Sequence, residues 1–538
     1  MSTEIGAAAV QTPSAIADEK DRKFFADLLI NLESAVDVNA IVVADLRLWP
    51  LIRWELGREI KGTAAVFGID ESVDRMRASG FAGAREERIE LAKRQRQDER
   101  ARYPDPRVQI DQQNARLRAG GACDFAVFSK VEKYYQPLDG KYYAPVLDPV
   151  YEDLSKRGRT RMLALEPLDL VCHHEPERFS ADPYMRTTSA LQKEDVCAPM
   201  RERLEKINEV LRDLAPGYRL DIDRLNNRLN RYRRRVQLFE DVLRAVQPKA
   251  IFCSSFVGWA PLIWAARRLG IVSVDIQHGG QSSYHYHTTH WSSVPPQGYE
   301  LLPDIFWVWG EEIRRFITPW LPGGATRHKA VVGGNRYVAK CRREFASLTD
   351  CDDGRNVLSC IARGERAILV TLGYSIDEIL PGNLLQAIKS TPEWVWLLRL
   401  HPINRGEAAV QELRTKIAAN GLANVEYESS TRLPLYALFT QVDFHITAFS
   451  TTCREAKAMG VESAIIHPIG RTYFADEIAA GIFAYAEEPA DIIKTVQGRV
   501  DALSDADSPP AYIATDDALV DDILKAVGQA RIIRKGID

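Results

Sequence analysis

Three short segments of the sequence place polar side chains directly after an apolar run. In the first, Asp275-Ile276-Gln277-His278-Gly279-Gly280 ends a predicted strand that starts at Ile271. The imidazole of His278 has a pKa near neutrality, so it can act as a general base or donate a hydrogen bond. The two glycines allow a tight turn close to a ligand. Taken alone, a His-Gly pair is better explained as a histidine hydrogen-bonded within its own loop.

The second segment is Arg399-Leu400-His401-Pro402, at the end of the strongly apolar stretch that begins at Trp394. Side chains alternate between the two faces of a strand, so Arg399 and His401 emerge on the same face. Two cationic or donor side chains at the end of a strand suit an anion, and phosphate is the natural candidate. An Arg-x-His pair by itself is only weakly specific for this role.

In the third segment, hydroxyl-bearing residues precede a predicted helix. Ser450, Thr451 and Thr452 come directly before the helix over 453–459. Hydroxyls at this position cap the free N–H groups of a helix, and that explanation is the commoner one. The same geometry also binds phosphate, through N–H groups and hydroxyls at the positive end of the helix dipole. In that second interpretation Glu455, in the first turn, can reach a ribose hydroxyl.

Metal and dinucleotide signals are weak in this sequence. His285, His287 and His290 could ligate zinc, but no cysteine or carboxylate lies at a matching spacing, so a loop that lines a sugar site is the better interpretation. Asp221 and Asp223 resemble a metal-binding acidic pair, but they start a predicted helix and are better explained as caps. Neither GxxxxGK(S/T) nor GxGxxG occurs, which disfavours P-loop and nicotinamide-dependent enzymes.

Alternating strands and helices must position the three segments. A predicted strand over 249–255, a helix over 258–270 and the strand from 271 fit a right-handed crossover in a parallel sheet, and a second alternating series begins near 329. Ligands of such sheets bind beyond the carboxyl ends of the strands, where the three segments lie. We therefore predict an α/β protein with two Rossmann-like, doubly wound domains. The expected division is a disordered leader (1–20), a helical N-terminal extension (21–120), a first domain (121–325) with a helical insert (190–246), a second domain (326–505) and a C-terminal helix that packs back on the first domain (506–538).

Length and composition agree with this organisation. The 538 residues exceed what a single hydrophobic core holds, and 46% hydrophobic with 27% charged residues is typical of a soluble globular protein. Lys and Arg number 70 against 74 Asp and Glu, which argues against nucleic acid as the main partner. No apolar run reaches the roughly 18 residues of a membrane span. The N-terminus lacks the order of a secretory signal, so we expect a cytoplasmic protein.

The combination of motifs resembles a known family. A strand that ends in Gln277-His278-Gly279, followed by Arg399-Leu400-His401-Pro402 and then by the Ser/Thr-rich helix start, is similar to GT-B glycosyltransferases of bacterial surface polysaccharides. The likeness is to the capsule polysaccharide group, which includes the Kdo transferases and is distantly similar to sialyl- and glycerophosphotransferases. It covers roughly 121–500. The segments Pro303–Gly310 and, more loosely, Leu48–Arg53 also resemble parts of that group.

This resemblance implies a cleft between the domains, with the nucleotide of the donor held by the second domain and the acceptor approaching the first. His401, with Arg399 beside it, and the hydroxyls over 450–452 would hold the donor phosphate, and Glu455 the ribose. His278 is the counterpart of a histidine implicated in catalysis. The expected acceptor or sugar contacts are Gln277, Gly279, His285 and His287.

The catalytic base stays open at this point. The acidic motif of the sialyltransferase-like members has its nearest match in Asp352-Asp353-Gly354, which we place in a loop and do not favour as the base. The remaining candidates are His278 and a carboxylate, with Asp275 favoured in the site. The other carboxylates considered are Asp148 and Glu132.

The sequence thus leads to one principal functional hypothesis and two alternatives. The principal one is transfer of a sugar from a nucleotide sugar, with CMP-linked donors such as CMP-Kdo slightly favoured, to a glycan or glycolipid acceptor. No metal or other cofactor is expected, no nucleic-acid partner is expected, and peripheral contact at the inner membrane face is considered. The alternatives are a nucleotide-sugar 2-epimerase of the same fold and a non-catalytic interaction protein on a GT-B scaffold.

Overall fold

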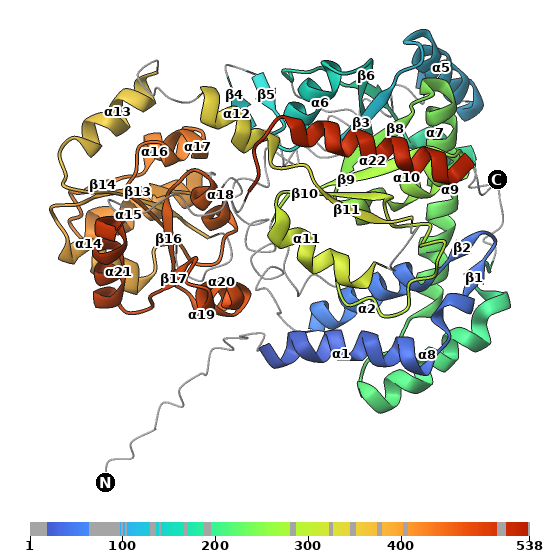
Figure 1. Ribbon diagram of the computed structural model, residues 1–538, viewed down its shortest axis with the longest axis horizontal. Helices are drawn as coiled ribbons and strands as arrows, with labels where there is room; N and C mark the ends of the chain where they lie inside the picture. The colour runs from blue at the N-terminus through green and yellow to red at the C-terminus, as the bar shows by residue number, and fades with distance from the viewer. Residues whose placement is uncertain are drawn as a thin grey trace.

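Two parallel β-sheets, one in each half of the chain, form the framework of the protein (Figure 1). Helices cover both faces of each sheet, so the predicted α/β class with two Rossmann-like, doubly wound domains is confirmed. The computed structural model describes residues 19–63, 97, 101–102, 105–129, 136–138, 141–165, 171–187, 195–279, 287–321, 327–344, 351–373, 379–401, 407–502 and 513–535.

The first sheet has seven strands, and each neighbouring pair in it is parallel. In spatial order they are β11 (Lys329–Val332), β10 (Ile305–Val308), β9 (Val272–Ile276), β8 (Ala250–Ser254), β3 (Phe125–Ser129), β6 (Thr160–Leu165) and β7 (Glu177–Phe179). Successive residues enter two different cores: Ile251 and Cys253 pack on one face, and Ala250 and Phe252 on the other. Burial of both faces explains why these strands are continuous apolar runs in the sequence.

The second sheet has six strands, which are also parallel throughout. In spatial order they are β14 (Val425–Glu426), β13 (Val395–Arg399), β12 (Ala367–Thr371), β15 (Phe444–Thr447), β16 (Glu462–Ile465) and β17 (Ala484–Tyr485). Leu369 packs on one face of β12, and Ile368 and Val370 pack on the other. In both domains, a parallel sheet therefore has an apolar core on each of its faces.

The helices of the two halves cover these sheets. In the first half they are α1 (Glu19–Ala35), α2 (Trp49–Thr63), α5 (Pro106–Ala119), α6 (Asp148–Ser155), α7 (Asp182–Thr187), α8 (Arg201–Leu214), α9 (Ile222–Val246), α10 (Phe256–Arg268) and α11 (Glu311–Ile317). In the second half they are α12 (Arg336–Glu344), α13 (Asp352–Ile361), α14 (Gly382–Ser390), α15 (Glu407–Ala419), α16 (Glu428–Arg432), α17 (Leu435–Phe439), α18 (Thr452–Ala458), α19 (Pro468–Tyr473), α20 (Ala475–Ala479), α21 (Pro489–Ala502) and α22 (Ala518–Lys535). No helix within the described ranges combines the length and apolar character that crossing a membrane requires.

Short elements complete the first half. They are the two-stranded ribbons β1 (Val42–Val43) with β2 (Leu46–Arg47) and β4 (Gln136–Leu138) with β5 (Lys141–Tyr143), and the 3-10 turns Val38–Ala40, Ala198–Met200 and Thr318–Trp320. The ribbon of β1 and β2 joins α1 to α2. Leu29 and Leu32 of α1 and Ile52 of α2 lie in the same core as the inner faces of α9 and α10. The N-terminal helices are therefore built into the core of the first domain.

Each sheet has one point at which the strand order reverses direction. In the first sheet the chain runs outward from β3 through β6 to β7 and then continues at β8 on the other side of β3. In the second sheet it runs from β12 through β13 to β14 and then continues at β15 on the other side of β12. Ligands of doubly wound sheets bind beyond the carboxyl ends of the strands at these switch points. The ends of β3 and β8, and those of β12 and β15, are therefore where a site is expected.

The border between the domains lies later in the chain than the sequence suggested. The segment over 329–332 was expected to open the second series, but β11 pairs with β10 at the edge of the first sheet, with Phe306 opposite Ala330. The chain then crosses to the second domain through α12. Near its end it returns: Val520 and Ile523 of α22 are buried with Val274 and Trp307 of the first sheet, and Figure 1 shows this helix lying along the first domain.

Aromatic rings and a buried arginine join the two domains. Tyr143, which ends β5, lies 5.7 Å from the ring of Tyr337 in α12, and Tyr337 lies 4.9 Å from Tyr436 in α17. Arg336, also in α12, is buried and donates to Asp153 of α6 at 2.7 Å. These contacts fix α12 against both domains at the crossing.

Candidate active site

At the switch point of the first sheet, a serine and a histidine lie side by side. β8 ends at Ser254 and α10 begins at Phe256, so Ser255 alone makes the turn, with a left-handed backbone (φ 65°). A non-glycine residue held in this conformation is a local strain of the kind that is concentrated at functional sites. The Oγ of Ser255 lies 3.1 Å from Nε2 and 3.2 Å from Nδ1 of His278, whose side chain is exposed. Sequence reasoning missed Ser255, although its position at a strand exit was the available signal.

Asp275 and Gln277, two residues that the sequence analysis placed in the site, form hydrogen bonds within the protein. Asp275 is 4% exposed, and its carboxylate accepts a hydrogen bond from the N–H of Phe256 at 2.9 Å. Burial raises the pKa of Asp275 well above its usual value. Gln277 donates to the carbonyl of Gly279 at 2.8 Å and accepts from the N–H of Trp309 at 2.8 Å. Both side chains hold the ends of β9, β10 and α10 in place.

Of the histidines in the following loop, the structure describes His287 and His290. His285 lies outside the described residues, whereas the ring of His287 packs edge-on against Trp54 of α2 at 6.4 Å. His290 has a positive φ of 58°, and its carbonyl accepts a hydrogen bond from Arg53. In the described part of the chain, no set of three or more His, Cys, Asp or Glu side chains is arranged to hold a metal ion.

Hydroxyl groups gather at the switch point of the second sheet. Thr371 ends β12, and its Oγ1 lies 2.9 Å from Oγ1 of Thr452, the first residue of α18. Thr447 ends β15 and accepts from the N–H of Ser450 at 3.3 Å, while the Oγ of Ser450 accepts from the N–H of Thr452 at 3.3 Å. Thr451 lies half-buried in the same turn. The structure thus brings Ser450, Thr451 and Thr452 together with two threonines that the sequence analysis did not select.

A buried histidine is hydrogen-bonded to Thr371, one of these hydroxyl-bearing residues. His445 in β15 lies between Thr371 Oγ1 and Ser463 Oγ, with both ring nitrogens 2.9 Å from a hydroxyl oxygen. Burial lowers the pKa of His445 to about 3, so the ring is neutral at physiological pH. A neutral imidazole has one donor and one acceptor nitrogen, which fixes the orientation of Thr371.

Arg399, which the sequence analysis placed at the donor phosphate, is buried and binds backbone carbonyls. Its side chain is 5% exposed and donates to the carbonyls of Ser430 and Leu433, with a longer bond to Thr431 at 3.4 Å. The carboxyl end of α16 thus covers the guanidinium, which satisfies the last carbonyls of that helix. His401, two residues later, is half-buried just beyond β13.

Glu455 is a carboxyl group near these hydroxyls whose pKa is raised toward neutrality. It is in the first turn of α18, half-buried, and burial raises its pKa to about 7, against the opposing effect of a hydrogen bond with Tyr436. A carboxyl group with this pKa exchanges protons readily at neutral pH, which is a property of catalytic acids and bases. Tyr436 connects it to the ring contacts at the domain junction.

The other candidate bases are not placed to react. Asp148 is fully buried at the start of α6 and accepts from the N–H of Ala144 at 2.8 Å, while Glu132 lies outside the described residues. Asp353 is the second residue of α13, where a loop was expected, and forms an ion pair with Arg432 at 2.6 Å. Among His278, Asp275 and Asp148, the described candidates that the sequence analysis retained, His278 is the exposed one.

Asp148 gives a prediction about stability. Burial raises its pKa in the folded state to about 7, from a usual value of 3.8. Between these two values the folded state binds the proton more tightly, so stability falls as the pH rises, by up to about 1.4 kcal/mol per pH unit. Asp148→Asn removes this dependence, so the variant should gain stability relative to the wild type between pH 5 and pH 8 in urea unfolding. Asp352→Asn, on the exposed start of α13, is the control. If the free energy of unfolding of Asp148→Asn differs from that of the wild type by the same amount at pH 5 and at pH 8, the raised pKa of Asp148 is contradicted.

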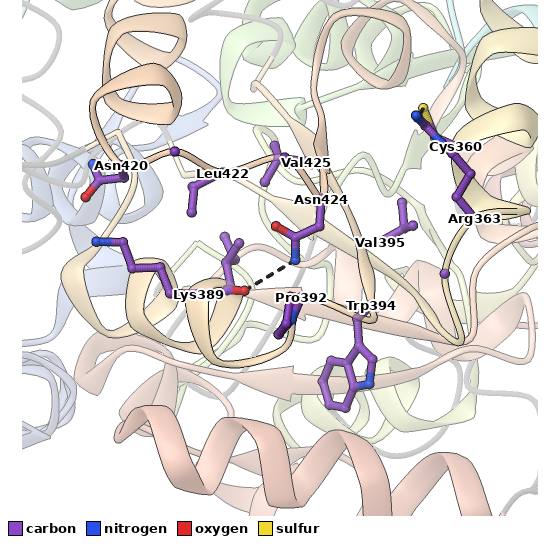
Figure 2. Close-up of a pocket in the computed structure, with 14 residues that line it drawn as sticks. Cys360, Arg363, Lys389, Pro392, Trp394, Val395, Asn420, Leu422, Asn424 and Val425 are labelled. Atoms are coloured by element: carbon purple, nitrogen blue, oxygen red, sulfur yellow. Dashed lines mark hydrogen bonds between the residues drawn. The ribbon is translucent and has the colours of Figure 1, made fainter.

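A cavity of about 450 Å³ lies at the opposite edge of the second sheet (Figure 2). It is bordered by Arg363 before β12, Lys389 at the end of α14 and Asn424 before β14, whose amide donates to the carbonyl of Ile388 at 3.3 Å. These residues precede their strands, so the cavity lies at the amino edge. None of the predicted site residues lines it, and doubly wound sheets bind their ligands at the other edge.

No protein-family model and no curated protein sequence matches the chain. Solved structures to which the chain is similar include the UDP-GlcNAc 2-epimerase from Methanocaldococcus jannaschii. The two sequences are 10% identical, the match covers 76% of this chain and 99% of that chain, and the TM-score is 0.46. The Neisseria meningitidis UDP-GlcNAc 2-epimerase bound to UDP-GlcNAc has 15% identity, 75% and 99% coverage, and a TM-score of 0.46. Glycyrrhiza uralensis UGT73P12, complexed with glycyrrhetinic acid 3-O-monoglucuronide, has 11% identity, 77% and 97% coverage, and a TM-score of 0.42. With TM-scores below 0.5, these likenesses leave the function of this chain to be argued from its own residues.

Proposed function

We propose that the protein is a glycosyltransferase that moves a sugar from a nucleotide-activated donor to a glycan or glycolipid acceptor. The observation that carries the proposal is the presence of polar groups at both topological switch points. Ser255 and His278 lie at one, and the hydroxyls of Thr371, Ser450 and Thr452 lie at the other. These are the two places where doubly wound sheets bind ligands.

The second domain would hold the donor. Hydroxyls and backbone N–H groups around Ser450 and Thr452 are suited to phosphate oxygens, and His401 is close in sequence to the end of the neighbouring strand β13. Glu455 is placed in this proposal at the ribose, as the short sequence motifs suggest. The same motifs favour a CMP-linked donor such as CMP-Kdo. Peripheral contact of the protein with the inner face of a membrane is part of the proposal.

The first domain would activate the acceptor. His278, held by Ser255, takes the proton from the attacking hydroxyl as its oxygen forms a bond to the anomeric carbon. The bond between that carbon and the phosphate oxygen breaks, and its electron pair leaves with the nucleotide. The negative charge that develops on the phosphate is stabilised by the hydroxyl and N–H donors of the second domain.

Nucleotide binding tests the donor site. We expect one of CMP, CDP, UDP and GDP to raise the melting temperature of the wild type by several degrees, because a ligand at 100 times its Kd stabilises the folded state by about 2.7 kcal/mol. Thr452→Val keeps the shape of the side chain and removes the hydroxyl, so it should weaken that binding about tenfold. Thr440→Val, at the carboxyl end of α17, is the control for a lost threonine hydroxyl elsewhere in the domain.

Two outcomes would contradict the proposed function. No shift with any of the four nucleotides would remove the basis for a nucleotide-sugar enzyme and favour an interaction protein on this scaffold. Interconversion of the sugar of UDP-N-acetylglucosamine without an acceptor would replace transfer by epimerisation at the same site. Transfer of labelled sugar from the responding nucleotide to a glycan acceptor is the expected result.

A further inference from the structure

The N-terminal helices meet in an ion pair that is closed to solvent. Glu33 of α1 and Arg53 of α2 have 0% exposed side chains, and Arg53 Nη1 lies 2.7 Å from Glu33 Oε1. Trp49 donates to the same oxygen at 2.7 Å. A buried pair of this kind contributes little net stability compared with apolar residues of the same volume, because both charges lose their hydration. The pair instead fixes the positions of the groups to which it is hydrogen-bonded.

Those hydrogen bonds reach the loop that follows His278. Arg53 donates from Nη1 to the carbonyl of His290 at 2.8 Å and from Nη2 to that of Thr289 at 2.9 Å, and its guanidinium carbon lies 4.0 Å from the centre of the Trp291 ring. The other oxygen of Glu33 accepts from the N–H of Ser292 at 2.6 Å. Residues 289–292 are thus bound through backbone groups to side chains more than 230 positions earlier.

A second contact of α2 reaches Phe256, the residue next to Ser255. The ring of Trp54, the neighbour of Arg53, packs edge-on against Phe256 at 6.0 Å and against His287 at 6.4 Å. Phe256 directly follows Ser255, the partner of His278. On the other side of His278, Gln277 is fixed to Trp309 and Gly279. Gln277, directly before His278, and residues 289–292, later in the chain, are therefore each held by hydrogen bonds.

We propose that Glu33 and Arg53 are positioning residues for His278, acting through residues 287–292 and through the contact of Trp54 with Phe256. This role rests on the proposed function of His278 as the base. It gives the N-terminal helices a part in the reaction, because they set the position of the loop next to the reacting group. A displacement of about 1 Å at a reacting group costs up to about 100-fold in rate.

Arg53→Lys tests this role, because it keeps the charge and loses the planar fork that bonds two carbonyls. We expect kcat to fall about 10–100-fold with the Kd of the nucleotide unchanged, and the pH dependence of kcat to shift. Hydrogen–deuterium exchange of the peptide over 287–294 should accelerate. Arg161→Lys is the matched control. Arg161, near the start of β6, is buried, pairs with Glu177 and donates to the carbonyl of Gly121. This control should lower the melting temperature without changing exchange over 287–294.

Glu33→Gln and Ser292→Ala keep the test decisive if Arg53→Lys does not fold. Glu33→Gln weakens the bond from the N–H of Ser292, and Ser292→Ala removes the second bond, which the Oγ of Ser292 donates to the same carboxylate oxygen. Each variant should accelerate exchange over 287–294. Unchanged exchange in that peptide and an unchanged pH profile in the folded variants would overturn the proposal. If the wild type transfers no sugar, the proposed function fails, whereas the exchange measurement still shows whether Glu33 and Arg53 hold the loop.

Discussion

Replacing His278 by alanine is expected to lower kcat for sugar transfer by about 10²–10⁴-fold, with the affinity for the nucleotide unchanged. General base catalysis contributes a factor of this size, and His278 is the exposed candidate base at the end of β9. The nucleotide is proposed to bind the second domain, so its Kd should not depend on this side chain. Steady-state transfer rates and nucleotide titration by calorimetry measure the two quantities.

Ser255→Gly is the matched control for this prediction. Glycine adopts the left-handed backbone of residue 255 without strain, so the variant removes the hydroxyl next to His278 and preserves the turn. We expect a smaller loss than for His278→Ala, together with a shift in the pH profile of kcat. Full activity of His278→Ala would place the base elsewhere, with Glu455 as the next candidate because its pKa is about 7.

Arg399→Met is expected to lower the free energy of unfolding of the second domain by about 3–5 kcal/mol. The substitution fills similar space but leaves the buried carbonyls of Ser430 and Leu433 without their donor. Each unsatisfied buried carbonyl costs about 1–3 kcal/mol. Urea unfolding followed by tryptophan fluorescence measures the loss, since Trp394 and Trp396 are buried in this domain.

Nucleotide affinity distinguishes the structural role of Arg399 from the phosphate contact that its position in the sequence suggested. At a temperature where Arg399→Met is folded, we expect nucleotide binding close to that of the wild type. Arg432→Met removes an arginine whose side chain is 56% exposed and whose partner is Asp353, and it should cost less than about 1 kcal/mol. A large loss of affinity with little loss of stability would return Arg399 to the donor site.

The sequence alone was sufficient for the fold class. Buried parallel strands are apolar on both faces, so β8, β9, β12 and β13 stand out as continuous apolar runs, and the polar residues after them mark their carboxyl ends. The same signal located His278 and the turn over 450–452. It missed Ser255 and Thr371, which also end strands, because a lone hydroxyl at such a position has no distinctive pattern.

What the sequence could not determine depends on contacts between distant residues. Strand β11 is a short apolar run like its neighbours, and only its pairing with β10 assigns it to the first sheet. Arg399 and Gln277 occupy positions that suit a ligand, yet the tertiary structure places α16 over one and Trp309 beside the other.

The sequence by itself therefore determined the two doubly wound domains and the edge of each sheet where chemistry can occur, because hydrophobic periodicity is a local property. Only the tertiary structure decided which polar side chains at that edge are already used by the protein. It also showed that Glu33 of α1 and Arg53 of α2 bind the backbone of residues 289–292. The physical reason is that a buried polar group takes whatever partner packs against it, and these partners lie tens to hundreds of residues away.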